Sequence, residues 1–278
     1  MAAGRHLPLL PPRDESATVR EHVPIAPEHY LLRVHAPYIA QHAEPGQFVQ
    51  VRVSPGFDPF LRRPFSISMA DPATGWIELV YRVVGSGTKS LAKRAVGEEI
   101  SVLGPLGHPF HLPKDATALL VGGGVGMPPL HFAAHRLRAD RTCVVQGART
   151  ASLLLYECEF EALKVTRYWA TEDGTAGVHG LVTHALRTAL DSVGGPVEIL
   201  SCGPIPMMAA VAEIARERGL PCQVSLEERM ACGFGICMGC AVALAGKPVA
   251  SPEYALVCVD GPVFRAAEVF PSQAPCQA

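Results

Sequence analysis

Residues 116–139, ATALLVGGGVGMPPLHFAAHRLRA, combine three features that together predict an α/β domain. An apolar run ends in glycines, and two prolines then open a segment of helical composition. Proline is tolerated in the first turn of a helix because the N–H it lacks has no partner there. A buried strand, a glycine turn and a helix in this order are typical of one unit of a parallel sheet.

The same alternation continues along the chain to about residue 222. Further strands are expected at 141–149, 165–174 and 196–204, and further helices at 152–164, 181–190 and 205–219. Strands that alternate with helices favour a parallel sheet with helices on its faces. We therefore predict an α/β, nucleotide-binding type of domain over residues 113–222.

The two ends of the chain have different patterns. Residues 1–17 are predicted to be a flexible tail, and residues 223–278 a small domain rich in cysteine and glycine. Between the tail and the α/β domain, residues 18–112 hold short strand-like runs separated by turn signals such as Pro-Gly and Thr-Gly. Many short, closely spaced strands predict a small antiparallel β-barrel. The fold class is thus a multi-domain protein, as its 278 residues also suggest.

Composition excludes several classes of function. A formal net charge of −2 and an aromatic content of 6% provide neither the basic surface nor the stacking side chains that nucleic-acid binding uses. The longest stretch without a formal charge, residues 116–135, is interrupted by glycines and prolines, so no membrane span is expected. The N-terminal residues show no signal-peptide core, which predicts a cytoplasmic protein whose nine cysteines are reduced.

Four cysteines stand apart from the others. Residues 227–244, EERMACGFGICMGCAVAL, contain Cys232, Cys237 and Cys240, and Cys258 follows. The C-x4-C-x2-C spacing matches the plant-type [2Fe–2S] pattern, and the glycines between these cysteines allow N–H groups to point at sulfur. A structural zinc site with four thiolates and simple burial are the alternatives. The remaining cysteines are scattered, and burial is the favoured interpretation for most of them. They are Cys143, Cys158, Cys202, Cys222 and Cys276.

Three other motifs are candidate ligand sites. The glycine loop of residues 122–126 and the Cys202-Gly203-Pro204 turn each end a strand and open a helix, where backbone N–H groups bind phosphate. Such turns also occur without ligands. In LRRPFSIS, residues 61–68, an arginine beside a proline can grip a pyrophosphate, although a surface arginine pair has the same sequence. Gly85, Gly87 and Thr88 form another small-residue loop, or only a tight turn.

In their order along the chain these motifs resemble the ferredoxin–NADP reductase superfamily. The C-terminal segment, with its cysteines and the DGPVF sequence of residues 260–264, resembles in particular the electron-transfer subunit of bacterial dihydroorotate dehydrogenase B. The resemblance implies an FAD-binding barrel, an NAD-binding α/β domain and a [2Fe–2S] segment. It also implies an FMN-containing dihydroorotate dehydrogenase catalytic subunit as partner, in a heterotetramer.

The resemblance assigns residues to each cofactor. The FAD site would comprise Arg63, Pro64, Phe65, Ser66, Val80, Tyr81, Arg82, Gly87 and Thr88. The NAD site would comprise Gly122, Gly123, Gly124, Gly126, Cys202, Gly203 and Pro204, and the cluster ligands would be Cys232, Cys237, Cys240 and Cys258. Glu172 and Asp173 would lie near NAD or in a solvated turn. Arg149 would either meet the 2′-phosphate of NADP or lie in a solvated turn, so NAD rather than NADP follows from the resemblance alone.

The implied function is electron transfer from the partner's FMN through [2Fe–2S] and FAD to NAD⁺, in pyrimidine biosynthesis. A flavin belongs between the other two groups because it exchanges both single electrons and hydride. No dihydroorotate site is expected on this chain. The alternatives are the same module in a ferredoxin-dependent transhydrogenase or a sulfhydrogenase, and a non-enzymatic adaptor with structural zinc.

The sequence departs from the family pattern at three places. Phe65 replaces a tyrosine, His108-Pro109 replaces Asn-Gly, and Val259 replaces a basic residue after the last cysteine. The expected consequences are the loss of a hydroxyl contact to flavin, a different loop shape after residue 107, and an altered surface around the cluster. None of the three removes a proposed ligand.

Overall fold

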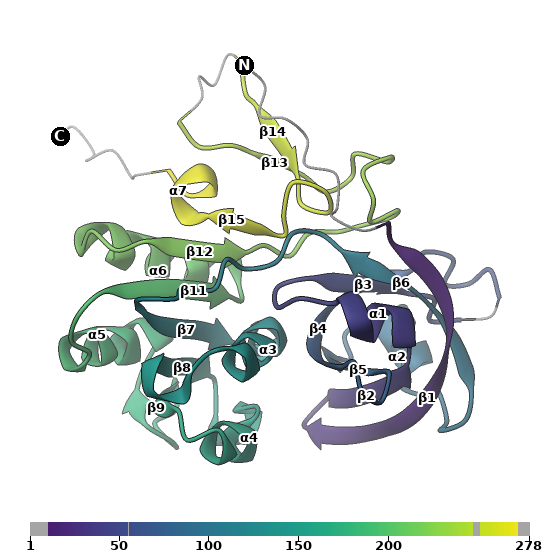
Figure 1. Cartoon of the computed structure of the whole chain (residues 1–278), viewed down its shortest axis with the longest axis horizontal. Helices are drawn as coiled ribbons and strands as arrows, with labels where there is room; N and C mark the ends of the chain where they lie inside the picture. Colours follow the sequence, from purple (N-terminus) through teal and green to yellow (C-terminus); the bar gives the residue numbers. More distant parts are fainter. Residues whose placement is uncertain (1–10, 55, 247–250, 272–278) are drawn as a thin grey trace.

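A computed structural model describes residues 11–54, 56–246 and 251–271. A closed barrel lies beside a seven-stranded sheet, and the C-terminal segment runs along the edge of both (Figure 1). The predicted multi-domain architecture of barrel, parallel sheet and C-terminal segment is therefore confirmed. Cys276 and residues 1–10 of the predicted tail lie outside the described residues.

The barrel consists of antiparallel strands in the order β1-β2-β5-β4-β3-β6. Successive strand side chains point to opposite faces, so Leu32, Val49 and Leu79 fill the interior while their neighbours face outward. Helices α1 (Pro37–His42) and α2 (Ser86–Leu91) connect strands of the barrel. The strands are β1 (Arg13–Ala26), β2 (His29–His35), β3 (Phe48–Val51), β4 (Arg63–Asp71), β5 (Trp76–Arg82) and β6 (Glu99–Leu106).

The predicted tail is wrong for residues 13–17, which begin β1. This part of the strand is polar and gives no apolar alternation to recognise. Its pairing with β6 fixes it, beginning with Arg13 opposite Gly104. The Glu15 carboxylate also accepts hydrogen bonds from the N–H groups of Tyr38 and Ile39, at the open start of α1.

The sheet has the order β10-β9-β8-β7-β11-β12-β15, and all its strands are parallel except β15. On β7, Ala118 and Leu120 pack with α3 and α4, whereas Leu119 and Val121 pack with α5 and α6. This alternation places one layer of helices on each face, as the sequence predicted. The strands are β7 (Thr117–Gly123), β8 (Thr142–Ala148), β9 (Thr166–Thr171), β10 (Val178–His179), β11 (Val197–Cys202), β12 (Cys222–Ser225) and β15 (Val263–Arg265). The helices are α3 (Met127–Arg136), α4 (Glu157–Ala162), α5 (Val182–Ser192) and α6 (Ile205–Glu217).

The helix expected at 152–164 is shorter than predicted. Residues 151–153 form a 3₁₀ turn, and α4 begins only at Glu157. The reason is Tyr156, whose φ of +63° lies in the left-handed region and interrupts any continuous helix. Tyr156 is buried, and its side chain reaches the barrel.

The predicted domain boundary at residue 222 falls inside the sheet. Strand β12 pairs parallel with β11, and β15 from the C-terminal segment pairs antiparallel with β12. β12 has only four residues and no helix follows it, so the alternation gave no sign of it. The rest of the segment is a two-stranded sheet, β13 (Ala241–Ala243) with β14 (Tyr254–Leu256), and α7 (Ala266–Val269).

An apolar cluster joins the C-terminal segment to both larger units. Phe48 and Leu106 of the barrel and Met208 of α6 pack with Leu256 and Phe264. The cysteine segment is therefore anchored against the barrel and the sheet together. Across the described ranges, no helix is long and apolar enough to cross a membrane.

Candidate cofactor sites

The two glycine-containing loops meet at the carboxyl ends of β7 and β11. These strands are neighbours, with Gly122 opposite Cys202. A Cβ on Gly126 would overlap the Cys202 carbonyl, so only glycine permits this approach. Strand β8 lies on one side of β7 and β11 on the other, which makes this the point where the strand order reverses. Open α/β sheets bind their ligands at such a point.

A cavity of about 580 Å³ opens at these loops. Its wall includes Gly123, Gly124, Gly126, Gly203 and Pro204, which the sequence assigned to NAD. The other two assigned residues, Gly122 and Cys202, are buried behind this wall rather than part of it. Gly122 and Cys202 thus support the wall from behind, whereas Gly126 both lines the cavity and permits the close approach of the two loops.

Of the three charged residues expected near NAD or in a solvated turn, two line this cavity and one does not. Arg149 and Glu172 both line it. Asp173 does not, because its carboxylate accepts hydrogen bonds from the N–H and hydroxyl of Thr175. These contacts lower the pKa of Asp173 and fix it in its turn.

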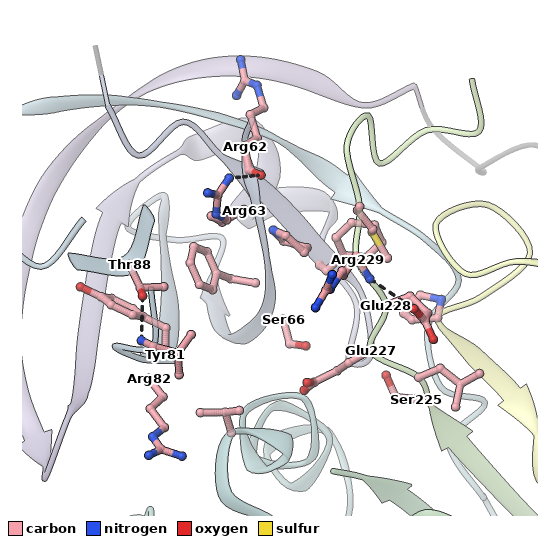
Figure 2. A pocket seen from close by; sticks show the side chains of 18 of the residues that line it. Arg62, Arg63, Ser66, Tyr81, Arg82, Thr88, Ser225, Glu227, Glu228 and Arg229 are labelled. Atoms are coloured by element: carbon pink, nitrogen blue, oxygen red, sulfur yellow. Dashed lines mark hydrogen bonds between the residues drawn. The ribbon is translucent and has the colours of Figure 1, made fainter. Parts of the chain in front are cut away.

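A larger cavity, about 1050 Å³, lies between the barrel and the segment after β12 (Figure 2). Its size suits a large nucleotide cofactor. Its wall contains eight of the nine residues assigned to FAD: Arg63, Pro64, Phe65, Ser66, Val80, Tyr81, Arg82 and Thr88. The ninth, Gly87, lies beneath the Arg63 side chain, where an added Cβ would come within 2.5 Å of Nε.

The two arginines of the RRPFS motif have different environments. Arg62 donates to the Asp14 carboxylate and the Ser101 hydroxyl, so it ties the residue before β4 to β1 and β6. Arg63 hydrogen-bonds, within the described chain, to the carbonyls of Leu61 and Arg62 and pairs with no carboxylate. Its guanidinium is therefore the one positioned to bind an anionic group in the cavity.

Replacing Arg63 with alanine is expected to weaken FAD binding by about 10- to 100-fold. This corresponds to a charge-assisted hydrogen bond of about 1.5–3 kcal/mol. The measurement is the dissociation constant of FAD for the deflavinated protein, followed by flavin fluorescence. Arg62→Ala is the matched control, because it removes the hydrogen-bond partner of Asp14 and leaves Arg63 in place. Equal loss of FAD in both variants would contradict a specific role for Arg63.

Other assigned residues shape the FAD cavity rather than offer polar groups to it. The Thr88 hydroxyl accepts hydrogen bonds from the N–H groups of Val84 and Gly85 and so closes the start of α2. The Tyr81 hydroxyl is hydrogen-bonded to His22, and burial raises the pKa of Tyr81. Phe65 packs on the Tyr81 ring with centroids 5.4 Å apart, which replaces a hydroxyl by an apolar contact.

Glu227 stands where the two cavities meet and was not identified from the sequence. It lines both of them, two residues after β12 ends. Figure 2 shows its carboxylate pointing into the larger cavity, toward Ser66. The surrounding protein partly withdraws the carboxyl from bulk water, which raises its pKa to about 7, although the side chain is exposed to the cavities themselves. A carboxyl group with this pKa can both take up and release a proton at neutral pH.

A buried polar network holds the sheet against the barrel. The Ser68 hydroxyl on β4 lies 2.7 Å from the Tyr156 hydroxyl and 3.0 Å from a Glu78 carboxylate oxygen. His131 on α3 lies 3.3 Å from the same hydroxyl, and burial lowers its pKa to about 3, so its ring is neutral. Because α3 begins at the glycine loop, these contacts fix the position of that loop relative to the FAD cavity.

The cysteine loop carries sulfur-directed N–H groups, as its glycines predicted. The Cys237 N–H points at Cys232 Sγ and the Gly239 N–H at Cys237 Sγ, each with a 3.5 Å N···S distance. Although burial opposes it, donation from the backbone of Cys237, Phe234 and Ile236 lowers the pKa of Cys232 to about 6. Thiolate is the form that binds metal. The loop therefore favours the ionised sulfur that a cluster requires.

The other two cysteines lie together beneath the loop. Burial raises the pKa of Cys258 to about 12, and the neighbouring Cys240 adds to the effect. Two thiols this close resist simultaneous ionisation unless a cation binds between them. Within the part of the chain that the structure describes, no three His, Cys, Asp or Glu side chains surround a common point. The fit to a [2Fe–2S] group thus rests on the donor chemistry: four thiols and the N–H groups aimed at them.

Two of the departures from the family pattern have structural consequences near this loop. Val259 packs over Gly235, where an added Cβ would lie 2.7 Å from the valine side chain. The His108 N–H donates to the Gly261 carbonyl, which joins the barrel to the DGPVF segment. Both contacts hold the cysteine segment in place.

Comparison with known protein families agrees with this three-part arrangement. Residues 3–111 match the oxidoreductase FAD-binding domain and residues 120–213 the oxidoreductase NAD-binding domain. Residues 227–270 match the iron–sulfur cluster binding domain of dihydroorotate dehydrogenase B. The dihydroorotate dehydrogenase B (NAD(+)) electron transfer subunit of Geobacillus thermodenitrificans is 43% identical over 92% of this chain and 98% of its own length.

The chain belongs to this family of electron transfer subunits. The Fusobacterium nucleatum member is 39% identical over 92% of this chain and 98% of its own. A chain of the NADH-dependent reduced ferredoxin–NADP oxidoreductase has a similar structure, with a TM-score of 0.81 and 33% identity over 92% of this chain and 90% of that one. Family membership makes the protein an oxidoreductase with domains for FAD, NAD and an iron–sulfur cluster.

Proposed function

We propose that this chain passes electrons from a partner dihydroorotate dehydrogenase, through a [2Fe–2S] cluster and FAD, to NAD⁺. The observation that carries the proposal is the junction of the two nucleotide-sized cavities at Glu227, with the cysteine segment packed on the barrel beside them. When bound, the cluster supplies single electrons, and the flavin converts them to the hydride that NAD⁺ accepts. The chain's own residues bind, orient and exchange a proton.

Binding and orientation follow from the described contacts. Arg63 would hold the anionic part of FAD, and the backbone of Gly123, Gly124 and Gly203 would bind the phosphates of the nicotinamide nucleotide. The Ser68–Tyr156–His131 network fixes the two cavities relative to each other. Hydride transfer needs this fixed relation because it occurs only between atoms in near contact.

Proton exchange belongs to Glu227. Storing two electrons as a hydride would require one proton from a neighbouring side chain, and the reverse direction would return that proton to it. The Glu227 carboxyl, with its pKa near neutrality, can supply or take the proton, and the Ser66 hydroxyl lies on the same side of the cavity. The carboxyl thus serves both directions of the reaction.

Dihydroorotate oxidation is assigned to the partner, an FMN-containing catalytic subunit. The names of the relatives support this, since they describe electron transfer subunits of dihydroorotate dehydrogenase B. The product of the complex is then orotate plus NADH. A heterotetramer and a cytoplasmic location stay predictions.

A second candidate function has one specific observation in its favour. The similarity to a chain of the NADH-dependent reduced ferredoxin–NADP oxidoreductase covers nearly all of both chains. The higher identity to the dihydroorotate dehydrogenase B subunits favours the first function. Affinity purification of the tagged chain from its own cells separates the two. Recovery of an FMN protein that oxidises dihydroorotate supports the proposal, whereas recovery of a large iron–sulfur flavoprotein supports the alternative.

A further inference from the structure

Gln50 is the one glutamine in the described chain whose buried amide lacks any hydrogen-bond partner. It lies on β3 with no exposed surface, and both its Oε1 and Nε2 are unpaired. Its strand neighbours Val49 and Val51 belong to the barrel core, so Gln50 points outward, on the same face as Phe48. That outward face is covered by the C-terminal segment.

The segment that covers Gln50 is the cysteine loop itself. Gly233, the residue after Cys232, lies directly on the amide: an added Cβ there would be 2.7 Å from Gln50 Cγ and 2.8 Å from Nε2. Gly233 also has a φ of +84°, so the loop bends at this contact. A glycine at this position lets the loop approach the amide as closely as its backbone allows.

A buried amide without a partner is costly, and an apolar side chain of the same size would avoid that cost. Its presence indicates a partner that binds at this place. The residue that covers the amide, Gly233, directly follows Cys232, and backbone N–H groups of the same loop already point at the sulfurs of Cys232 and Cys237. A carboxamide N–H can join such a set of donors without bringing charge.

We propose that the Gln50 carboxamide donates a hydrogen bond to a sulfur of the bound [2Fe–2S] cluster and raises its reduction potential. The inference rests on the proposed iron–sulfur function. Reduction adds a negative charge to the cluster, and an N–H donor stabilises the more negative state. Gln50 is thus a positioning and tuning residue that the barrel contributes to the cluster of the neighbouring segment.

The test is the midpoint potential of the cluster in the Gln50→Met variant, measured by a redox titration followed by EPR. Methionine keeps the length and volume of glutamine and removes the N–H. We expect the equilibrium constant for one-electron reduction to fall about tenfold, a shift of about 59 mV to lower potential. The flavin potential, titrated in the same sample, should stay unchanged.

Gln223→Met is the matched control. Gln223 is also a buried glutamine, but its amide is paired with the backbone of His111 and with Glu198, away from the cysteine loop. The cluster potential of this variant should equal that of the unaltered protein. A cluster potential unchanged in Gln50→Met, or a shift confined to the flavin, would overturn the proposal.

A measurement on the unaltered protein covers the case in which Gln50→Met does not fold. Protein labelled with ¹⁵N in its glutamine side chains should show a weak ¹⁵N coupling to the reduced cluster in pulsed EPR. Absence of that coupling in a sample with a full cluster signal overturns the role of Gln50 and leaves the electron-transfer function intact. A protein that assembles no [2Fe–2S] cluster at all would instead refute the proposed function.

Discussion

Replacing Cys237 with serine is expected to lower NADH formation driven by the partner subunit by at least about 10²-fold. Cys237 is one of the four proposed thiolate ligands and also accepts the Gly239 N–H, so its replacement would remove a ligand and loosen the loop. FAD should remain bound, because no cysteine is among the described residues that line the FAD cavity. NADH oxidation with ferricyanide should persist for the same reason. The measurements are the iron and flavin content, the visible spectrum and both rates.

Cys158→Ser is the matched control for this variant. Cys158 is an exposed free thiol on α4, far along the chain from the cysteine loop. Its replacement should leave iron content and both rates unchanged. A Cys237→Ser protein that retained full transfer from the partner would contradict the role of this loop as the route of electrons.

Replacing Glu227 with glutamine is expected to slow the exchange of electrons with NAD by about 10²-fold. A carboxamide has nearly the same shape but neither takes up nor releases a proton, and general acid–base groups contribute about this much or more. The rates in both directions, with FAD and NADH binding measured alongside, check this expectation. Loss of rate with intact binding separates proton exchange from a merely structural role.

The pH dependence gives Glu227 a signature with a defined sign. Its pKa of about 7 means that the acid form predominates below neutrality and the carboxylate above it. Partner-driven NAD⁺ reduction consumes a proton, so its rate should fall as pH rises through about 7. NADH oxidation with ferricyanide releases a proton, so its rate should rise over the same range. Identical profiles in Glu227→Gln and the unaltered protein would exclude this role.

Much of the site was predictable because its signals are local in the sequence. The spacing of Cys232, Cys237 and Cys240 and the glycines between them specify sulfur-directed N–H groups within one short loop. The glycine turn of residues 122–126 ends a buried strand, and that context is visible in the sequence as well. The two nucleotide cavities were expected for the same reason.

Features that depend on distant parts of the chain were not predictable. Nothing in Glu227-Glu228 tells which of the two lies at the junction of both cavities, because the end of β12 in the sheet decides it. In the sequence Gln50 has the pattern of an ordinary outward-facing strand residue, and only the structure shows that the cysteine loop covers it. β1 and β12 were missed in part since pairing with β6 and β11, rather than apolar periodicity, holds them.

The proposed electron transfer is tested most directly by NADH formation from dihydroorotate and NAD⁺ when the purified chain is mixed with the proposed FMN-containing partner. Absorbance at the NADH band follows the reaction, with each chain alone as control. We expect NADH to appear only when both chains are present, and the Cys237→Ser chain to fail to replace the unaltered one. NADH formation from dihydroorotate by this chain alone, or no NADH from the mixed chains with all three cofactors bound, would contradict the proposed electron transfer.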